Sequence, residues 1–192
     1  MAEAFRRERK GRISCHIEPS ERALITQLLG ELCALLTTDD LPETADLDPL
    51  MRELGLADLA CAQVSDPDDP VLRRLLPSGY PGDPEAAAEF RRYTDTSLRT
   101  GKIDDARTMK ATLDALGDDG SGFVAIDKTE ATAWLRAIND LRLALGVQLN
   151  VTAESYPDPT ELADDDQAAF SAALYDFLTW WQDSLVRALL PR

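Results

Sequence analysis

The chain has 192 residues, and its composition is that of a folded, acidic protein. A hydrophobic content of 44% excludes an intrinsically disordered chain, because a chain of this length and composition can bury a sizeable core. The formal net charge of −15 excludes broad attraction to nucleic acid, because lysine and arginine supply most of the affinity for phosphate. No run approaches the roughly 20 apolar residues of a membrane span, and no secretory signal is visible. We expect a single domain over residues 1–192, in the cytoplasm and without membrane contact.

The first twelve residues depart from this acidic balance. They carry Arg6, Arg7, Arg9, Lys10 and Arg12. Charged termini are usually solvated, so we expect residues 1–11 to form a flexible basic arm. Contact of this arm with nucleic acid or an acidic partner is the alternative.

Hydrophobic periodicity predicts the elements of the first third. Residues 12–18 alternate between apolar and polar side chains, which predicts a short strand. Pro19 and Ser20 then open a helix to about Leu36 that is apolar on two faces. The region 37–69 is rich in Asp and Pro and predicts irregular structure, with short helices at 49–53 and 56–64.

Asp-Pro pairs mark the next two helix starts. Asp69-Pro70 predicts a short helix that ends before Pro77, and Asp83-Pro84 predicts a long helix to about Leu116. Gly101 lies inside this long helix, where glycine costs about 1 kcal/mol relative to alanine. We expect a bend or a break there.

The last third contains a strand and two helices. We expect a turn at 117–122, a strand at 123–126, and a helix to about Gly146 that Asp127 and Glu130 cap. After a loop at 152–160, residues 162–190 predict a final helix. Its apolar face comprises Phe170, Leu174, Phe177, Trp181 and Leu185. The fold class is therefore mostly α (α+β): a multi-helix bundle with a small two- or three-stranded β element.

The sequence offers no recognisable catalytic or metal-binding pattern. Its one histidine, His16, follows Cys15 directly and points to the opposite face of the expected strand. The chain also lacks a phosphate-binding glycine-rich loop, an EF-hand and a CxxC pair. We expect a protein that is not an enzyme and that needs no cofactor or metal.

Two polar groups stand out from this background. Asn139 and Arg142 fall between Leu135 and Leu143, so we expect both to be half-buried, either in a structural network or in a ligand or partner site. The second group consists of basic residues spread along the expected long helix. It comprises Arg91, Arg92, Arg99 and Lys102. These residues form either an interaction face or a charged face with internal pairs, such as that of Asp95 with Arg99.

The cysteines Cys33, Cys61 and Cys15 are candidates for redox chemistry. Reversible disulfide formation needs an accessible, partly ionised thiol near a second one. Cys33 lies on an apolar helical face that protects it, whereas Cys61 lies in the irregular acidic region. The alternative is that all three are small buried or bystander residues.

Four sequence segments carry a resemblance to a known family. They are Asp69–Pro77, Phe90–Lys102, Trp134–Gly146 with its Asn-Asp-Leu-Arg-Leu run, and Tyr175–Thr179. Together they resemble the actinobacterial oxidative stress regulator (AosR) family, long catalogued as a domain of unknown function. The resemblance spans nearly the whole chain.

The resemblance implies a redox-responsive transcription regulator that senses through thiols and binds a protein partner, such as a sigma factor or an RNA polymerase subunit. Direct DNA contact and a homodimer stay open. The alternatives are a non-catalytic adaptor or scaffold in protein quality control, and a small-molecule-binding protein that uses the Asn139 and Arg142 region.

Overall fold

The computed structural model describes residues 2–37, 67–116, 122–152 and 166–190. Within these ranges it contains five α-helices and a three-stranded antiparallel sheet, which confirms the mostly α fold class. The helices expected at 49–53 and 56–64, most of the 117–122 turn and nearly all of the 152–160 loop lie outside the described residues.

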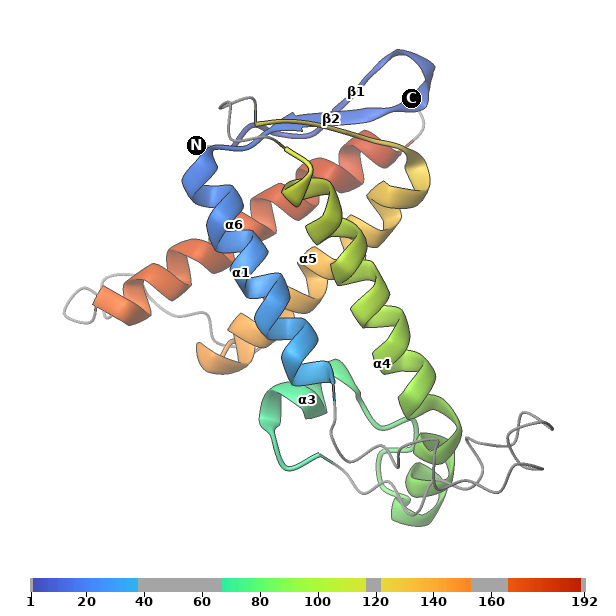
Figure 1. Cartoon of the computed structure of the whole chain (residues 1–192). Helices are drawn as coiled ribbons and strands as arrows, with labels where there is room; N and C mark the ends of the chain where they lie inside the picture. The colour runs from blue at the N-terminus through green and yellow to red at the C-terminus, as the bar shows by residue number, and fades with distance from the viewer. Residues whose placement is uncertain (1, 38–66, 117–121, 153–165, 191–192) are drawn as a thin grey trace.

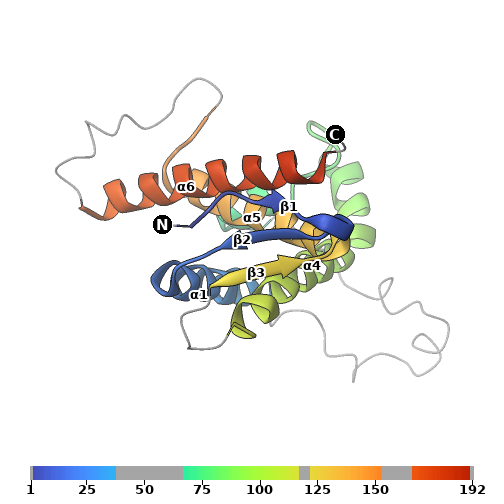
Figure 2. The same ribbon diagram turned by 90° about the horizontal axis from the view of Figure 1, so that it is seen from above.

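The sheet pairs two strands near the N-terminus with a third strand from the interior of the sequence. Its strands are β1 (Arg6–Arg7), β2 (Ile13–His16) and β3 (Phe123–Ile126), in the order β1-β2-β3. A short 3₁₀ helix, η1 (Arg9–Gly11), joins β1 to β2, and β2 pairs with β3 so that Cys15 lies opposite Val124. Seen from above, the sheet overlies the helices, and β1 lies on the side of the C-terminal helix (Figure 2).

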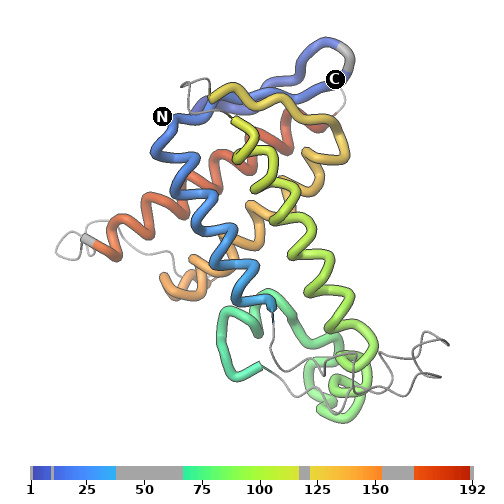
Figure 3. Tube along the Cα trace, viewed as in Figure 1, coloured from blue at the N-terminus to red at the C-terminus, as the bar shows by residue number. Residues whose placement is uncertain are grey.

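The helices are α1 (Pro19–Leu36), α3 (Pro70–Leu75), α4 (Pro84–Asp114), α5 (Lys128–Gln148) and α6 (Asp166–Leu189). Helix α4 packs against both α1 and α5, and α5 packs against α6 (Figure 1). The tube in Figure 3 shows that α4 runs from the sheet at one end of the molecule to α3 at the other.

The capping residues predicted from the sequence lie at the N-termini of α3, α4 and α5. The Asp69 carboxylate accepts hydrogen bonds from the backbone N–H groups of Val71 and Leu72, and Asp83 accepts one from Ala86. Asp127 and Glu130 form a reciprocal capping box at the start of α5. Each aspartate satisfies backbone donors that would otherwise have no partner, which fixes where its helix begins.

Of the bend or break expected at Gly101, the break is wrong, because helix α4 passes through this glycine without interruption. Gly101 is exposed and in open space. Its cost of about 1 kcal/mol is small beside the burial of Ala106, Met109 and Leu113 against α1 and α5.

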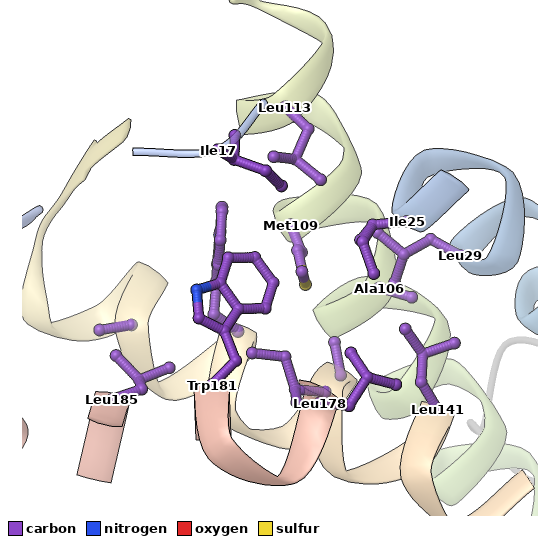
Figure 4. Close-up of a cluster of buried hydrophobic side chains, with 14 of the residues drawn as sticks. Ile17, Ile25, Leu29, Ala106, Met109, Leu113, Leu141, Leu178, Trp181 and Leu185 are labelled. Atoms are coloured by element: carbon purple, nitrogen blue, oxygen red, sulfur yellow. The ribbon is translucent and has the colours of Figure 1, made fainter. Parts of the chain in front are cut away.

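The core lies where α1, α4, α5 and α6 meet under the sheet, and Trp181 points into its centre (Figure 4). Its largest fully buried side chains include Trp134, Trp181, Ile17, Ile25, Leu29, Met109, Leu113 and Ile138. Of the apolar face expected on the last helix, Leu174, Trp181 and Leu185 are buried, Phe177 is half-buried, and Phe170 is exposed. The helix was predicted correctly, but its buried face excludes Phe170.

The N-terminal residues belong to the fold, so the flexible arm expected at 1–11 is a wrong prediction for residues 2–11. Phe5 is only 5% exposed. Its ring centroid lies 5.1 Å from that of Trp181 in a stacked arrangement and 5.9 Å from that of Trp134 at right angles. The backbone N–H of Phe5 also donates to Ser184 Oγ on α6. Aromatic burial of this size holds the segment in place despite its charged neighbours.

Phe5→Ala should therefore lower the free energy of unfolding by about 3–5 kcal/mol, because it removes a ring that touches both core tryptophans. Urea denaturation followed by tryptophan fluorescence measures the change. Phe123→Ala, at a ring that is 57% exposed, is the matched control and should change stability by less than about 0.5 kcal/mol. Equal effects of the two substitutions would contradict the burial of Phe5.

Candidate functional site

A polar network joins α5 to α6 and contains both residues that the sequence singled out on α5. Asn139 and Arg142 are half-buried, as expected. Gln182 of α6 lies between them: its Nε2 donates to Asn139 Oδ1 and to the Leu135 carbonyl, each at 3.5 Å, and its Oε1 accepts from Arg142 Nη1 at 2.5 Å. Gln182 therefore links the two residues across the helix interface.

Arg142 makes two further contacts with α6. Its Nε donates to Thr179 Oγ1 at 2.9 Å, and its Nη2 donates to Tyr175 Oη at 3.4 Å. The guanidinium also lies over the Tyr175 ring, 5.3 Å from the centroid. Sequence reasoning did not find Tyr175, Thr179 or Gln182 as members of this site. Their spacing of three and four residues on one helix face was the available signal.

Two pockets flank the network. The first has a volume of about 370 Å³ and is lined by Lys102, Asp105, Leu135, Arg136, Asn139, Asp140 and Gln182. The second has a volume of about 430 Å³ and is lined by Arg74, Arg142, Leu143, Gly146, Val147, Val151, Thr152 and Tyr175. The two candidate residues thus belong to different pockets.

Charges in the first pocket neutralise one another. Lys102 Nζ donates to Asp140 Oδ1 at 2.7 Å, and Arg136 donates through Nε and Nη2 to both oxygens of Asp105 at 2.6 Å. Asp140 is only 2% exposed, and this burial raises the pKa of its carboxyl group, against the opposing effect of the Lys102 ammonium. The pocket presents paired ions, which stabilise the contact between α4 and α5.

Two of the four basic residues expected to form an interaction face on α4 are buried. Arg91 is 6% exposed and Arg99 is 7% exposed, so that prediction is wrong for both. Asp95, between them, accepts a hydrogen bond from Arg99 Nε at 2.5 Å and lies 4.0 Å from Arg91 Nη1. The Asp95–Arg99 pair has the predicted helical spacing, but it points into the protein.

The other two basic residues of α4 differ from each other. Arg92 is exposed, with its guanidinium 5.6 Å from the Tyr93 ring centroid, and Lys102 is half-buried against Asp140. The four residues therefore do not make one continuous basic surface.

The outer face of α6 is aromatic. Phe170 is 55% exposed and Trp180 is 43% exposed. With Ala173 and Phe177 they follow a spacing of three and four residues, and the rings of Phe177 and Trp180 lie 6.1 Å apart. We call these four residues the outer α6 face. Exposed aromatic groups of this kind mark interaction surfaces.

Two kinds of feature are absent from the described ranges. No cluster of three or more His, Cys, Asp or Glu side chains there could hold a metal ion. No helix in the same ranges has the length and hydropathy needed to cross a membrane.

Comparison with known proteins identifies the family. A family model described as a domain of unknown function (DUF2017) matches residues 2–189. The chain belongs to this family. Proteins of Mycobacterium bovis and Mycobacterium tuberculosis, each named "Oxidative stress regulator AosR", are 33% identical over 189 residues, which cover 93% of this chain and 83% of theirs. No solved structure shows a significant match. These matches confirm the resemblance found in the sequence.

Within this DUF2017 chain, the two described cysteines have different environments. Cys15 lies in β2 and is 3% exposed; burial, followed by the nearby Glu3 carboxylate, raises the pKa of its thiol to about 12. Cys33 on α1 is partly exposed, so the protection expected for it on an apolar helical face is incomplete. Burial raises the pKa of Cys33 as well, but Arg107 and Lys110 act in the opposite direction. Cys61 lies outside the described residues.

Cys15 and Cys33 are too far apart to form a disulfide in this fold. Cys15 precedes the start of α1 at Pro19, and Cys33 lies about 21 Å along the helix from Pro19 at 1.5 Å per residue. A disulfide needs Cα atoms within about 7 Å of each other. An intramolecular pairing of these two thiols would require α1 to unfold.

In the native protein, Cys33 should be alkylated by iodoacetamide at pH 8 at least about tenfold faster than Cys15, because a thiol of pKa about 12 is ionised to only about one part in ten thousand at that pH. Peptide mass spectrometry over a time course measures each cysteine separately. In urea the two rates should converge, which serves as the control. Rapid native labelling of Cys15 would show that β2 opens.

Proposed function

We propose that this chain is a non-enzymatic regulator of the response to oxidative stress that binds a protein of the transcription machinery through the outer α6 face. The relatives named "Oxidative stress regulator AosR", similar over 93% of this chain, support the regulatory role. The observation that carries the binding mode is the aromatic face of α6, in which the rings of Phe170 and Trp180 are exposed and the ring of Phe177 is half-buried beside Trp180.

The outer α6 face has the chemistry of a protein-binding surface. Trp181, next to Trp180, is fully buried in the core, so α6 holds its outer aromatic residues on a rigid support. Trp and Phe contribute large contact areas at interfaces, and a few such residues supply most of the binding energy. A helix fixed on one side by the core presents these rings with little loss of conformational entropy on binding.

The charge of the chain favours a basic partner. With a net charge of −15, and with Asp176 and Asp183 exposed on α6, association with a basic surface is accelerated by electrostatic steering. Proteins that contact DNA carry basic surfaces, because phosphate binding requires them. A sigma factor or an RNA polymerase subunit fits this description better than DNA itself, which the acidic fold repels.

Redox input at a thiol is part of this proposal. Of the two described cysteines, Cys33 is the more accessible one; burial raises the pKa of its thiol, and Arg107 and Lys110 offset part of that rise. Cys15 is enclosed by the sheet and the core. We assign oxidation to Cys33, whose modification would act at the contact of α1 with α4.

The test uses the full-length chain and purified core RNA polymerase and sigma factors of the host, with binding measured by biolayer interferometry under reducing and peroxide-treated conditions. At least one of these proteins should bind, and Trp180→Ala should weaken that binding about tenfold or more. Phe123→Ala, at a ring on β3 that is 57% exposed against 43% for Trp180, is the control and should leave binding unchanged.

Three outcomes would overturn the proposal. They are a lack of binding to every one of these proteins in both conditions, equal losses from Trp180→Ala and Phe123→Ala, and a homodimer that Trp180→Ala dissociates. The homodimer would be detected by size-exclusion chromatography with light scattering, and it would assign the outer α6 face to a second copy of this chain.

A further inference from the structure

The pocket beside Arg142 has an unusual charge balance for so acidic a protein. It lies where the C-terminal half of α5 faces α6 and α3, and its volume of about 430 Å³ falls within the range of small-molecule sites. Arg74 and Arg142 both line it, and no described carboxylate does. The pocket wall therefore carries positive charge in a chain whose net charge is −15.

Arg142 is held in a fixed orientation by neutral groups alone. Its hydrogen-bond partners in the described part of the chain are Thr179, Gln182 and Tyr175, which carry no charge at neutral pH. A guanidinium has five N–H donors, and these contacts use three of them. Two donors and a full positive charge are left at a half-buried position.

Three other cations in the described ranges, unlike Arg142, pair with a carboxylate. Lys102 pairs with Asp140, Arg136 with Asp105, and Arg99 with Asp95, at N–O distances of 2.7, 2.6 and 2.5 Å. A partly buried charge costs free energy unless an opposite charge offsets it. Among the described residues, hydrogen bonds orient Arg142 but no carboxylate pairs with it, so its charge is available to an anionic ligand.

The remaining walls define the class of anion. Leu143, Val147 and Val151 supply apolar surface, and Tyr175 supplies a ring. Inorganic phosphate would leave this apolar surface unused, whereas a planar carboxylate matches the fork of a guanidinium. We propose that the pocket binds a small organic carboxylate with an apolar body, its carboxylate at Arg142 and Arg74 and its body against Leu143, Val147 and Val151.

This proposal is independent of the outer α6 face, because the two sites lie on opposite sides of the helix: Tyr175 and Gln182 face α5, whereas Phe170 and Trp180 face solvent. A small acid and a protein partner could be bound separately. The failure of either proposal leaves the other intact.

Isothermal titration calorimetry of the full chain with phenylacetate, octanoate, phenylacetamide and inorganic phosphate tests the pocket. At least one of the two carboxylates should bind saturably below about 1 mM, and phenylacetamide should bind at least about tenfold more weakly than phenylacetate, because it lacks the charge. Arg74→Gln should weaken carboxylate binding about tenfold. Because Arg74 is exposed, this substitution should leave the fold intact.

Arg73→Gln is the matched control, because Arg73 is an exposed arginine in the same helix but does not line the pocket. It should bind the carboxylate as the unmodified chain does. Arg142→Gln should abolish binding while circular dichroism shows a folded protein. Absence of saturable binding by both carboxylates, equal binding of phenylacetamide, tighter binding of phosphate, or equal effects of Arg73→Gln and Arg74→Gln would each overturn the proposal.

Discussion

The buried ion pairs of Asp95 set the arrangement of the helices. Asp95 contacts Arg99 and Arg91 one turn away on either side, and the three residues are among the most buried charged groups described. Arg99 also donates to the Leu36 carbonyl at the end of α1, and Arg91 donates to the Leu76 carbonyl after α3. The arginines thus satisfy carbonyls that helix ends leave without partners, while Asp95 offsets their charge. One cluster on α4 thus contacts the C-terminal ends of both α1 and α3.

The sequence was sufficient for the helices and for β2 and β3, but not for β1 or for what the faces of these elements contact. Aspartates before Pro70, Pro84 and Lys128 predicted three helix starts, because capping is a local interaction. The burial of Arg91 and Arg99 was missed, because a four-residue spacing shows that charges pair but not which side of the helix faces solvent. Phe5 was missed for a related reason: a single aromatic residue in a basic run has no periodicity, and its partners Trp134 and Trp181 are remote in sequence.

The candidate site shows the same limit. Asn139 and Arg142 were found because they interrupt an apolar stripe on one helix, and the half-burial predicted for them is correct. Their partners on α6 lie more than thirty residues away and become neighbours only when α5 packs against α6. Packing also places the two residues in different pockets: one contains paired ions, and the other is lined by two arginines and by no carboxylate of the described ranges. Helix α6 therefore contributes to two surfaces: an inner one with Arg142 and an outer one with exposed aromatic rings.

The dependence of the fold on Asp95 can be measured directly by urea denaturation of Asp95→Asn beside Asp183→Asn. Asp183 pairs with Arg187 at the same four-residue spacing, but in solvent. Asp95→Asn should lower the free energy of unfolding by about 3–5 kcal/mol, because it removes the buried carboxylate that pairs with Arg99 and lies 4.0 Å from Arg91. Asp183→Asn should change it by less than about 0.5 kcal/mol. Equally small changes for the two variants would contradict the account and would show that α1, α3 and α4 are held together without this buried charge.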